Sequence, residues 1–303
     1  MYDVIIIGAG PAGLTAAIYA MRARLSTLVL EQAGPGGQVL TTSEVENYPA
    51  LPGISGYELG VKMKEHADQL GMQMVSEAVK EIIWEDNRKC VKTDKAEYET
   101  KTLVIASGAV HAKLGLEDEE RLAGMGVSYC ATCDGAFYRD RVTAVVGGGD
   151  VALEDAIFLS RLCKKVYLIH RRNELRGAKV LQETVMSLPN VEILWDSVVT
   201  GIHGEEEVES ITVQNRVTEE TTDYQVDGIF IAVGIRPTSE IIKNIVNCDE
   251  GGYIIAGEDG KTSTAGIYAA GDVRTKPLRQ IVTAAADGAN VIYSIQEYLS
   301  GMR

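Results

Sequence analysis

Two cysteines separated by two residues are the most reactive feature of this chain. They are Cys130 and Cys133, in the run Cys130-Ala131-Thr132-Cys133. Such a pair can close a small disulfide and open it again by thiol–disulfide exchange. A zinc site needs four ligands. The chain has no second Cys-x-x-Cys and only four histidines, none at ligand spacing from the pair. The pattern therefore predicts a redox pair and no metal, with two packed free cysteines as the alternative.

Asp134 follows the cysteine pair directly. A carboxyl group there could donate and accept the proton that thiol–disulfide exchange moves. The alternative is a turn residue before Gly135. The remaining cysteines, Cys90, Cys163 and Cys248, fall in strand-like, helical and loop contexts, and we interpret them as structural.

A glycine-rich loop opens the chain, with Gly8, Gly10 and Gly13 in the pattern Gly-x-Gly-x-x-Gly. It joins a predicted buried strand, 2–8, to a predicted helix, 11–23. In that context the glycines let a pyrophosphate approach the helix N-terminus. Eighteen residues past Gly13 stands Glu31, where a carboxylate accepts from ribose hydroxyls and repels a 2′-phosphate. The first loop therefore predicts FAD or NAD rather than NADP.

A second glycine-rich loop has the same pattern, Gly147-x-Gly149-x-x-Ala152, with alanine in place of the third glycine. His170 stands eighteen residues past Ala152, the same distance as from Gly13 to Glu31. The cations Arg171, Arg172 and Arg176 follow it. Guanidinium groups pair well with phosphate. The second loop therefore predicts NADPH rather than NADH, and a solvated basic stretch is the alternative.

The elements that must position these loops form two βαβ units. The second unit is predicted from a strand at 142–147, a helix at 150–162 and a strand at 165–170. Antiparallel strands are expected within 77–104. A matching stretch in the second unit is expected to hold strands at 191–195, 209–214 and 228–233, and a closing helix is expected at 287–299. The fold class is α/β, with two Rossmann-like dinucleotide-binding domains. Each domain is expected to have three layers in the order ββα. A boundary near 113–117 and a return near 244–251 make one domain discontinuous.

Composition narrows the class of partner. The 303 residues carry a formal charge of −14, which disfavours nucleic acid and anionic membrane. Five cysteines are too few and odd in number for a disulfide framework. No signal peptide is expected ahead of the first strand, and no apolar run is long enough to span a bilayer. We expect a cytoplasmic protein in a reducing compartment.

The chain resembles the low-molecular-weight thioredoxin reductases over essentially its whole length. The resemblance is carried by both glycine loops, the Cys130–Gly135 run, and the arginine cluster that follows His170. Further motifs are Gly36-Gly37-Gln38, Val45-Glu46-Asn47-Tyr48-Pro49, Gly266-Ile267-Tyr268-Ala269-Ala270-Gly271-Asp272-Val273 and Arg279-Gln280. One departure is the insertion of Ala50-Leu51 between Pro49 and Pro52-Gly53, which affects a loop contour.

The resemblance implies an FAD domain at 1–113 and 248–303, and an NADPH domain at 114–247 that carries the redox pair. Catalytic candidates are Cys130, Cys133 and Asp134. The flavin candidates are Gly8, Gly10, Pro11, Ala12, Gly13, Glu31, Gln32, Gly37, Gln38, Asn47, Asp272, Val273, Arg279 and Gln280. The NADPH candidates are Gly149, Asp150, His170, Arg171, Arg172 and Arg176.

The resemblance also implies an activity. NADPH would reduce FAD, FAD would reduce the cysteine pair, and the dithiol would reduce thioredoxin, with rotation of the NADPH domain between half-reactions and a homodimeric assembly. Three alternatives stay open: another electron donor such as a ferredoxin, a peroxidase-linked acceptor, and a non-catalytic flavoprotein. The sequence does not tell which cysteine faces the flavin.

Overall fold

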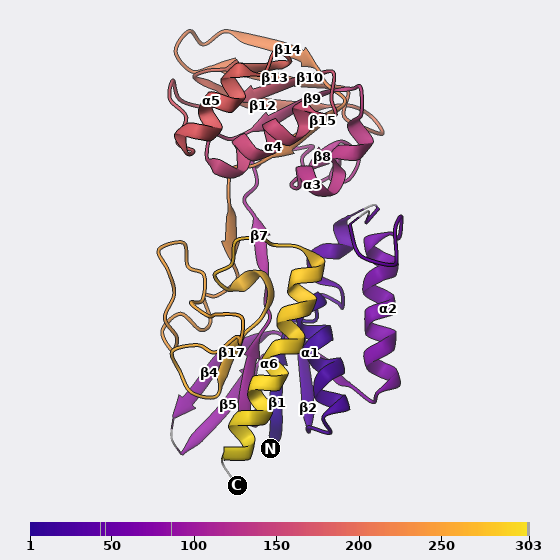
Figure 1. Ribbon diagram of the computed structural model, residues 1–303, viewed down its shortest axis with the longest axis vertical. Helices are drawn as coiled ribbons and strands as arrows, with labels where there is room; N and C mark the ends of the chain where they lie inside the picture. The colour runs from indigo at the N-terminus through magenta and orange to yellow at the C-terminus, as the bar shows by residue number, and fades with distance from the viewer. Residues whose placement is uncertain (43, 46, 86, 302–303) are drawn as a thin grey trace. The chain divides into compact units, whose positions relative to one another are not determined.

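The chain crosses between two structural units twice (Figure 1). The computed structural model describes residues 1–42, 44–45, 47–85 and 87–301. The first unit comprises Met1–Val110 and Arg236–Arg303, and the second comprises His111–Ile235. The two crossings lie in β7 (Ala109–His111) and β16 (Ile235–Pro237), which pair as a two-stranded ribbon. The first unit is therefore discontinuous in sequence.

The second crossing differs from the predicted return near 244–251. The segment after β16 already belongs to the first unit, because Ile242 and Val246 lie in the same buried cluster as Ile5 and Ile7. Burial of these apolar side chains holds the segment in the core of the first unit, so the chain returns before it and not within it.

A parallel sheet forms the centre of the first unit. Its strands run in the order β3 (Gln73–Ser76), β2 (Thr27–Glu31), β1 (Tyr2–Ile7) and β6 (Glu97–Ile105), and β17 (Ile267–Ala269) pairs with the end of β6. The β1 sequence is apolar at nearly every position because both faces of the sheet are covered.

Helices cover one face of this sheet and an antiparallel layer covers the other (Figure 1). On one face α1 (Pro11–Arg22) and α6 (Ile281–Gly301) pack on Val4 and Ile6. On the other face β4 (Val79–Glu85) and β5 (Arg88–Thr93) extend from the first half of β6 and pack on Ile5 and Ile7. A further helix, α2 (Gly56–Gln69), begins at Ser55, whose hydroxyl caps it. The first unit also contains two 3-10 turns, η1 (Gly37–Thr41) and η3 (Gly271–Val273), and the second unit contains a third, η2 (Gly135–Tyr138).

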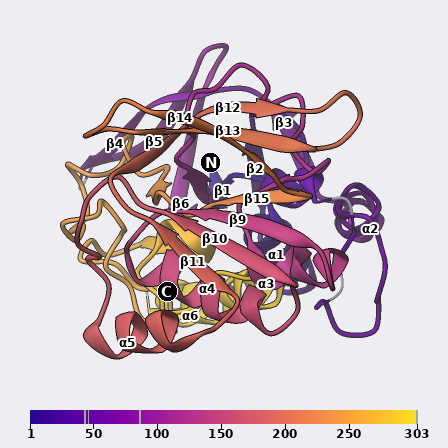
Figure 2. The ribbon, with the colours of Figure 1, turned by 90° about the horizontal axis from the view of Figure 1, so that it is seen from above.

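The second unit repeats the plan. Its five parallel strands run in the order β11 (Val191–Leu194), β10 (Lys165–Ile169), β9 (Val142–Val146), β15 (Gly228–Ile231) and β8 (Val127–Ser128). Figure 2 shows α4 (Asp150–Ser160) and α5 (Lys179–Ser187) on one side of this sheet. The antiparallel strands β12 (Ser197–His203), β13 (Ser210–Asn215) and β14 (Thr221–Gln225) cover the other side. A single turn, α3 (Ala131–Asp134), follows β8.

The predicted α/β class with two units of one ββα plan is therefore confirmed. Among the described residues, no helix is both long and apolar enough to cross a membrane.

Candidate redox and nucleotide-binding sites

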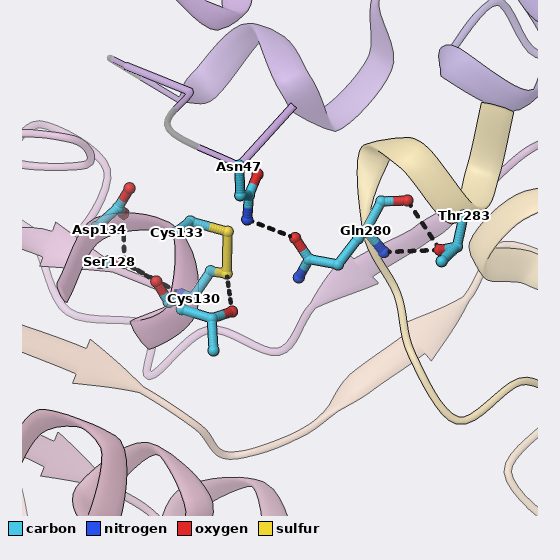
Figure 3. Close-up of a disulfide and its surroundings, with 8 residues drawn as sticks. Asn47, Ser128, Cys130, Cys133, Asp134, Gln280 and Thr283 are labelled. Carbon is cyan, nitrogen blue, oxygen red and sulfur yellow. Dashed lines mark hydrogen bonds between the residues drawn. A yellow bond between two sulfur atoms is a disulfide. The ribbon is translucent and has the colours of Figure 1, made fainter. Parts of the chain in front are cut away.

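Cys130 and Cys133 form a disulfide in the second unit (Figure 3). Cys130 is the N-cap of α3, and its carbonyl oxygen accepts from the N–H groups of Cys133 (3.2 Å) and Asp134 (3.1 Å). This single helical turn holds the two Cα atoms 5.3 Å apart. Both cysteines are partly exposed.

Ser128 links the disulfide turn to Asp134. The Ser128 hydroxyl donates to Asp134 Oδ2 (2.6 Å) and accepts from the N–H of Cys130 (3.1 Å). Burial raises the pKa of Asp134, and the hydrogen bond from Ser128 opposes that shift. Figure 3 shows the Asp134 carboxyl directed toward Ser128, on the side of the turn away from the sulfur atoms. Asp134 therefore gives up its proton less readily than an exposed carboxyl group does, and Ser128 connects it to the Cys130 backbone.

The other three cysteines have a different environment. Cys90, Cys163 and Cys248 are free thiols, the first two fully buried and the third partly buried. Burial raises the pKa of each of them. A protonated, buried thiol is a poor nucleophile, which agrees with the interpretation of these residues as structural. No group of three or more metal-ligating side chains lies together in the described ranges.

The first glycine loop joins β1 to α1. Gly8 has φ +103°, and a Cβ there would lie 2.3 Å from the carbonyl oxygen of Ala106. A Cβ on Gly13 would meet the Gly8 carbonyl at 1.9 Å, so both positions exclude a side chain. A Cβ on Gly10, the N-cap of α1, would find no atom nearer than Gly37 Cα at 4.0 Å. Gly10 therefore leaves open the space in front of the helix N-terminus, where a pyrophosphate binds in such loops.

Glu31, at the end of β2, lies against this loop. Its Oε2 accepts from the N–H of Ala9 (2.8 Å) and its Oε1 from the N–H of Ala33 (2.8 Å). The backbone therefore fixes the carboxylate beside the loop, as the prediction of ribose recognition requires. Pro11 and Ala12 lie in the first turn of α1, Gln32 follows Glu31, and Gly37 and Gln38 open η1.

Two buried polar atoms in the first unit lack a partner among the described residues, and both belong to predicted flavin contacts. They are Asp272 Oδ1 on η3 and Arg279 Nε before α6. Burial raises the pKa of Asp272, although the charges of Lys276 and Arg279 oppose the shift. Because an unsatisfied buried polar group is costly, these atoms fit a polar ligand such as the ribityl chain of FAD. Val273, beside Asp272, is fully buried.

The remaining flavin candidates contact one another. Asn47 Nδ2 donates to Gln280 Oε1 (2.9 Å), and the Gln280 N–H donates to Thr283 Oγ1 (3.1 Å) (Figure 3). The Arg279 guanidinium stacks over the Tyr253 ring at 4.1 Å. Glu46, in the same sequence motif as Asn47, lies outside the described residues.

A buried ion cluster supports η3 from α6. The Asp287 carboxylate accepts from Arg274 Nε (2.8 Å) and Nη2 (2.7 Å), Lys276 Nζ (2.9 Å) and the N–H of Gly271 (2.8 Å). The Asp287 and Arg274 side chains are each 4% exposed. Hydrogen bonds from its cationic partners hold the pKa of Asp287 below its ordinary value, against the effect of burial.

The second glycine loop joins β9 to α4. A Cβ on Gly149, the N-cap of α4, would find nothing within 4 Å, so the space before this helix is open too. A Cβ on Gly148 would lie 2.2 Å from the His170 ring. His170 is buried, and its ring nitrogens lie 3.0 Å from the Gly147 carbonyl and 2.8 Å from the Glu174 carbonyl. His170 therefore holds the glycine loop and the arginine-rich loop together, and its ring is packed inside the protein.

The arginine-rich loop lines a surface pocket of about 360 Å³. Arg171, Arg172 and Arg176 are exposed and line it together with a fourth cation, Arg216, and the acids Glu174 and Asp196. Asp150, at the start of α4, fixes the C-terminal end of the arginine-rich loop, because its Oδ1 accepts from the N–H of Ala178 (2.7 Å). Sequence spacing did not identify Arg216, because it follows β13, far along the chain from β10.

Comparison with known proteins places the chain in a family. Residues 2–288 match the family described as pyridine nucleotide-disulphide oxidoreductase. The thioredoxin reductase of Bacillus subtilis strain 168 is 44% identical over 304 aligned positions, covering 100% of this chain and 96% of that protein. The crystal structure of thioredoxin reductase from Streptococcus pyogenes is 45% identical, with a TM-score of 0.95 and 99% of both chains covered.

A third relative has another electron donor in its name. A ferredoxin-flavin thioredoxin reductase from Clostridium acetobutylicum is 30% identical, with a TM-score of 0.54, and the match covers 99% of this chain and 98% of that one. The glycine loops, the disulfide and these full-length matches agree. The chain therefore belongs to the pyridine nucleotide-disulphide oxidoreductase family, and within it to the thioredoxin reductases.

Proposed function

We propose that this chain uses NADPH to reduce the disulfide of thioredoxin, through FAD and the Cys130–Cys133 pair. The observation that carries the proposal is a partly exposed disulfide in the same unit as a pocket lined by four arginines. FAD, when bound, accepts a hydride from NADPH and delivers an electron pair to a disulfide. The protein's own part is to hold both nucleotides and to move the electrons on from the cysteines.

The two units divide the nucleotides between them. The first unit would hold FAD, because Glu31 is fixed beside the Gly8–Gly13 loop and Asp272 offers an unpartnered oxygen. A carboxylate at the ribose site disfavours a 2′-phosphate. The second unit would hold NADPH, because the arginine pocket lies at the end of β10, where the 2′-position is recognised. The Gly149 and Asp150 positions would face the NADPH pyrophosphate.

The cysteines complete a two-electron exchange. Two electrons and two protons convert the Cys130–Cys133 disulfide to two thiols. One of them, as thiolate, attacks a sulfur of the thioredoxin disulfide and forms a mixed disulfide, and the second cysteine then attacks that bond. The Cys130–Cys133 disulfide forms again and thioredoxin leaves as a dithiol. Asp134 would hold and return the proton that this exchange moves.

Both half-reactions need the same flavin, although the NADPH pocket and the disulfide belong to one unit. We therefore propose that the second unit rotates about the β7–β16 ribbon between half-reactions. We also propose a homodimer in a reducing cytosol, with no nucleic acid or membrane partner. The net charge of −14 disfavours nucleic acid and anionic membrane, and the sparse cysteines support a reducing compartment, whereas the homodimer rests on the family resemblance.

Anaerobic titration of the flavin-loaded protein with NADPH tests the proposal. We expect the flavin absorbance to bleach with more than one equivalent of NADPH per flavin, because the disulfide takes up a second electron pair. Oxidised thioredoxin should then restore the absorbance. Bleaching without reoxidation would require another acceptor. An absence of bleaching by NADPH, combined with bleaching by reduced ferredoxin, would overturn the proposed donor.

A further inference from the structure

Arg216 is an additional cation in the arginine pocket, supplied by a separate part of the fold. It stands in the turn between β13 and β14, whereas Arg171, Arg172 and Arg176 follow β10. All four line the same pocket. Neither the spacing from the glycine loop nor the family resemblance pointed to this residue.

Three hydrogen bonds tie Arg216 to the arginine-rich loop. Arg216 Nη1 donates to the carbonyl oxygen of Arg171 (3.3 Å). The Arg216 N–H donates to the carbonyl of Asp196 (2.7 Å), and the Asp196 N–H donates to the carbonyl of Arg172 (3.2 Å). Asp196 adopts the left-handed conformation, with φ +50°, in the turn between β11 and β12. Three separate turns of the second unit therefore meet at one pocket wall.

The turn that carries Arg216 is itself well fixed. Asn215 Oδ1 accepts from the N–H groups of Val217 (2.9 Å) and Thr218 (3.0 Å), and Asn215 Nδ2 donates to the Trp195 carbonyl (3.3 Å). Such an Asx turn restrains the backbone on which Arg216 stands. The guanidinium is therefore presented from a restrained turn, although the side chain itself is exposed.

The charge balance of the pocket suits a phosphate monoester. Four guanidinium groups face two carboxylates, Glu174 and Asp196. A guanidinium has five N–H donors and stays charged at any physiological pH. The hydrogen bond to the Arg171 carbonyl uses one donor of Arg216, which leaves its other N–H groups able to pair with phosphate oxygens. A ribose without the phosphate would gain little from this cluster.

We propose that Arg216 is a specificity-determining residue for the 2′-phosphate of NADPH. It contributes its own charge to the phosphate and orients the Arg171–Arg172 loop through the Arg171 carbonyl. The inference rests on the proposed function, because it assumes that the pocket receives the 2′-phosphate. It goes further by assigning part of the discrimination between NADPH and NADH to the β13–β14 turn.

The test compares NADPH and NADH as donors to saturating oxidised thioredoxin in Arg216→Ala, Arg216→Lys and Arg161→Ala variants. Arg161 is an exposed arginine just after α4 in the same unit, outside the pocket, and serves as the matched control. We expect Arg216→Ala to raise KM for NADPH about tenfold, with kcat and the NADH kinetics unchanged. Lysine should restore part of the loss, since it keeps the charge and loses the planar fork.

Calorimetric binding of 2′,5′-ADP and of 5′-ADP gives a second readout that needs no turnover. Arg216→Ala should weaken 2′,5′-ADP about tenfold and leave 5′-ADP unchanged. If the wild-type protein prefers NADPH and Arg216→Ala behaves like Arg161→Ala, the role of Arg216 is overturned and the proposed function stands. If the wild-type protein shows no preference for NADPH, both are overturned.

Discussion

Five cysteines share this chain, and their surroundings separate the reactive pair from the rest. Cys130 and Cys133 are partly exposed and bonded to each other, whereas Cys90 and Cys163 are buried and Cys248 partly buried. Burial raises the pKa of these three thiols, so few of them are ionised at neutral pH. Reactivity is therefore confined by solvation as well as by spacing.

Replacing either partner of the disulfide separates the two half-reactions. We expect Cys130→Ser and Cys133→Ser each to lower thioredoxin reduction at least about a thousandfold, because a single thiol cannot complete the exchange. Flavin reduction by NADPH should persist in both variants and consume about one equivalent instead of two, as an anaerobic titration would measure. Cys248→Ser is the control and should keep full turnover. Loss of flavin reduction in both variants would contradict this division of roles.

The spacing of the motifs located the candidate site residues along the chain but did not show in which direction their side chains point. The count of eighteen residues from Ala152 correctly finds the end of β10, yet the ring of His170 is turned inward to the Gly147 and Glu174 carbonyls. Arg216 enters the same pocket from a turn that no local pattern marks. Side-chain direction and long-range proximity depend on how the strands pack, which a count of residues does not contain.

At the level of elements, α6 links the two parts of the predicted flavin site. A Cβ on Gly288 would lie 2.2 Å from the Ala12 carbonyl, so only glycine permits α6 to approach α1 this closely. The preceding residue, Asp287, binds Gly271 at the start of η3. Neighbouring residues of one helix therefore fix both the first glycine loop and the turn that carries Asp272.

Neutralising Asp287 should destabilise the first unit and weaken flavin binding. In Asp287→Asn, Arg274 and Lys276 lose their shared carboxylate, which we expect to lower the free energy of unfolding by about 3 to 5 kcal/mol at pH 7.5. The folded pKa of Asp287 is lowered, so its stabilisation is present above the unfolded pKa of about 4 and is lost as the pH falls below that value.

Urea unfolding at pH 7.5 and at about pH 3, below the unfolded pKa of Asp287, with flavin release followed by fluorescence, measures this effect. The difference between Asp287→Asn and wild type should shrink at the lower pH. Asp68→Asn, which removes an exposed ion pair with Lys64, should change stability by less than about 1 kcal/mol at either pH. Equal stability of Asp287→Asn and wild type at pH 7.5 would show that the cluster is dispensable.

The elements that the sequence predicted are those with strong local signals. The apolar runs of β1, β9 and β10 and the glycine loops identified both βαβ units, and the antiparallel β4, β5 and β13 were expected as well. Helices α2 and α5 and strands β3, β12 and β14 were not predicted. The three strands are short and mixed in polarity, as in Thr221–Gln225, and both helices carry many polar residues, so these elements depend on packing within their own units.

At the scale of the whole molecule, the second unit has complete cores of its own. All side chains of its two apolar clusters, from Leu114 to Ala232, lie within His111–Ile235. The first unit draws β17 and α6 from the chain beyond residue 235. The second unit is therefore contiguous in sequence, and the first unit is not.

A fragment of residues 111–235 should therefore fold alone. We expect cooperative thermal unfolding by circular dichroism and binding of 2′,5′-ADP, because both clusters and the arginine pocket are present. A fragment of residues 1–110 should remain unfolded, because it lacks the α6 side chains that pack on Val4 and Ile6. Non-cooperative melting of 111–235 would contradict the independence of the second unit.

The discontinuity of the first unit also sets an order of events on the ribosome. Strands β1, β2 and β6 are synthesised first, yet β17, which pairs with β6, ends only at Ala269. At roughly 5 to 20 residues per second, the intervening stretch takes roughly ten to thirty seconds to synthesise. During that interval the inserted unit can finish folding, while Val4, Ile6 and Val104 still await α6. The nascent chain therefore displays an apolar sheet face that α1 covers only in part, a substrate for chaperones, until its last helix has been made.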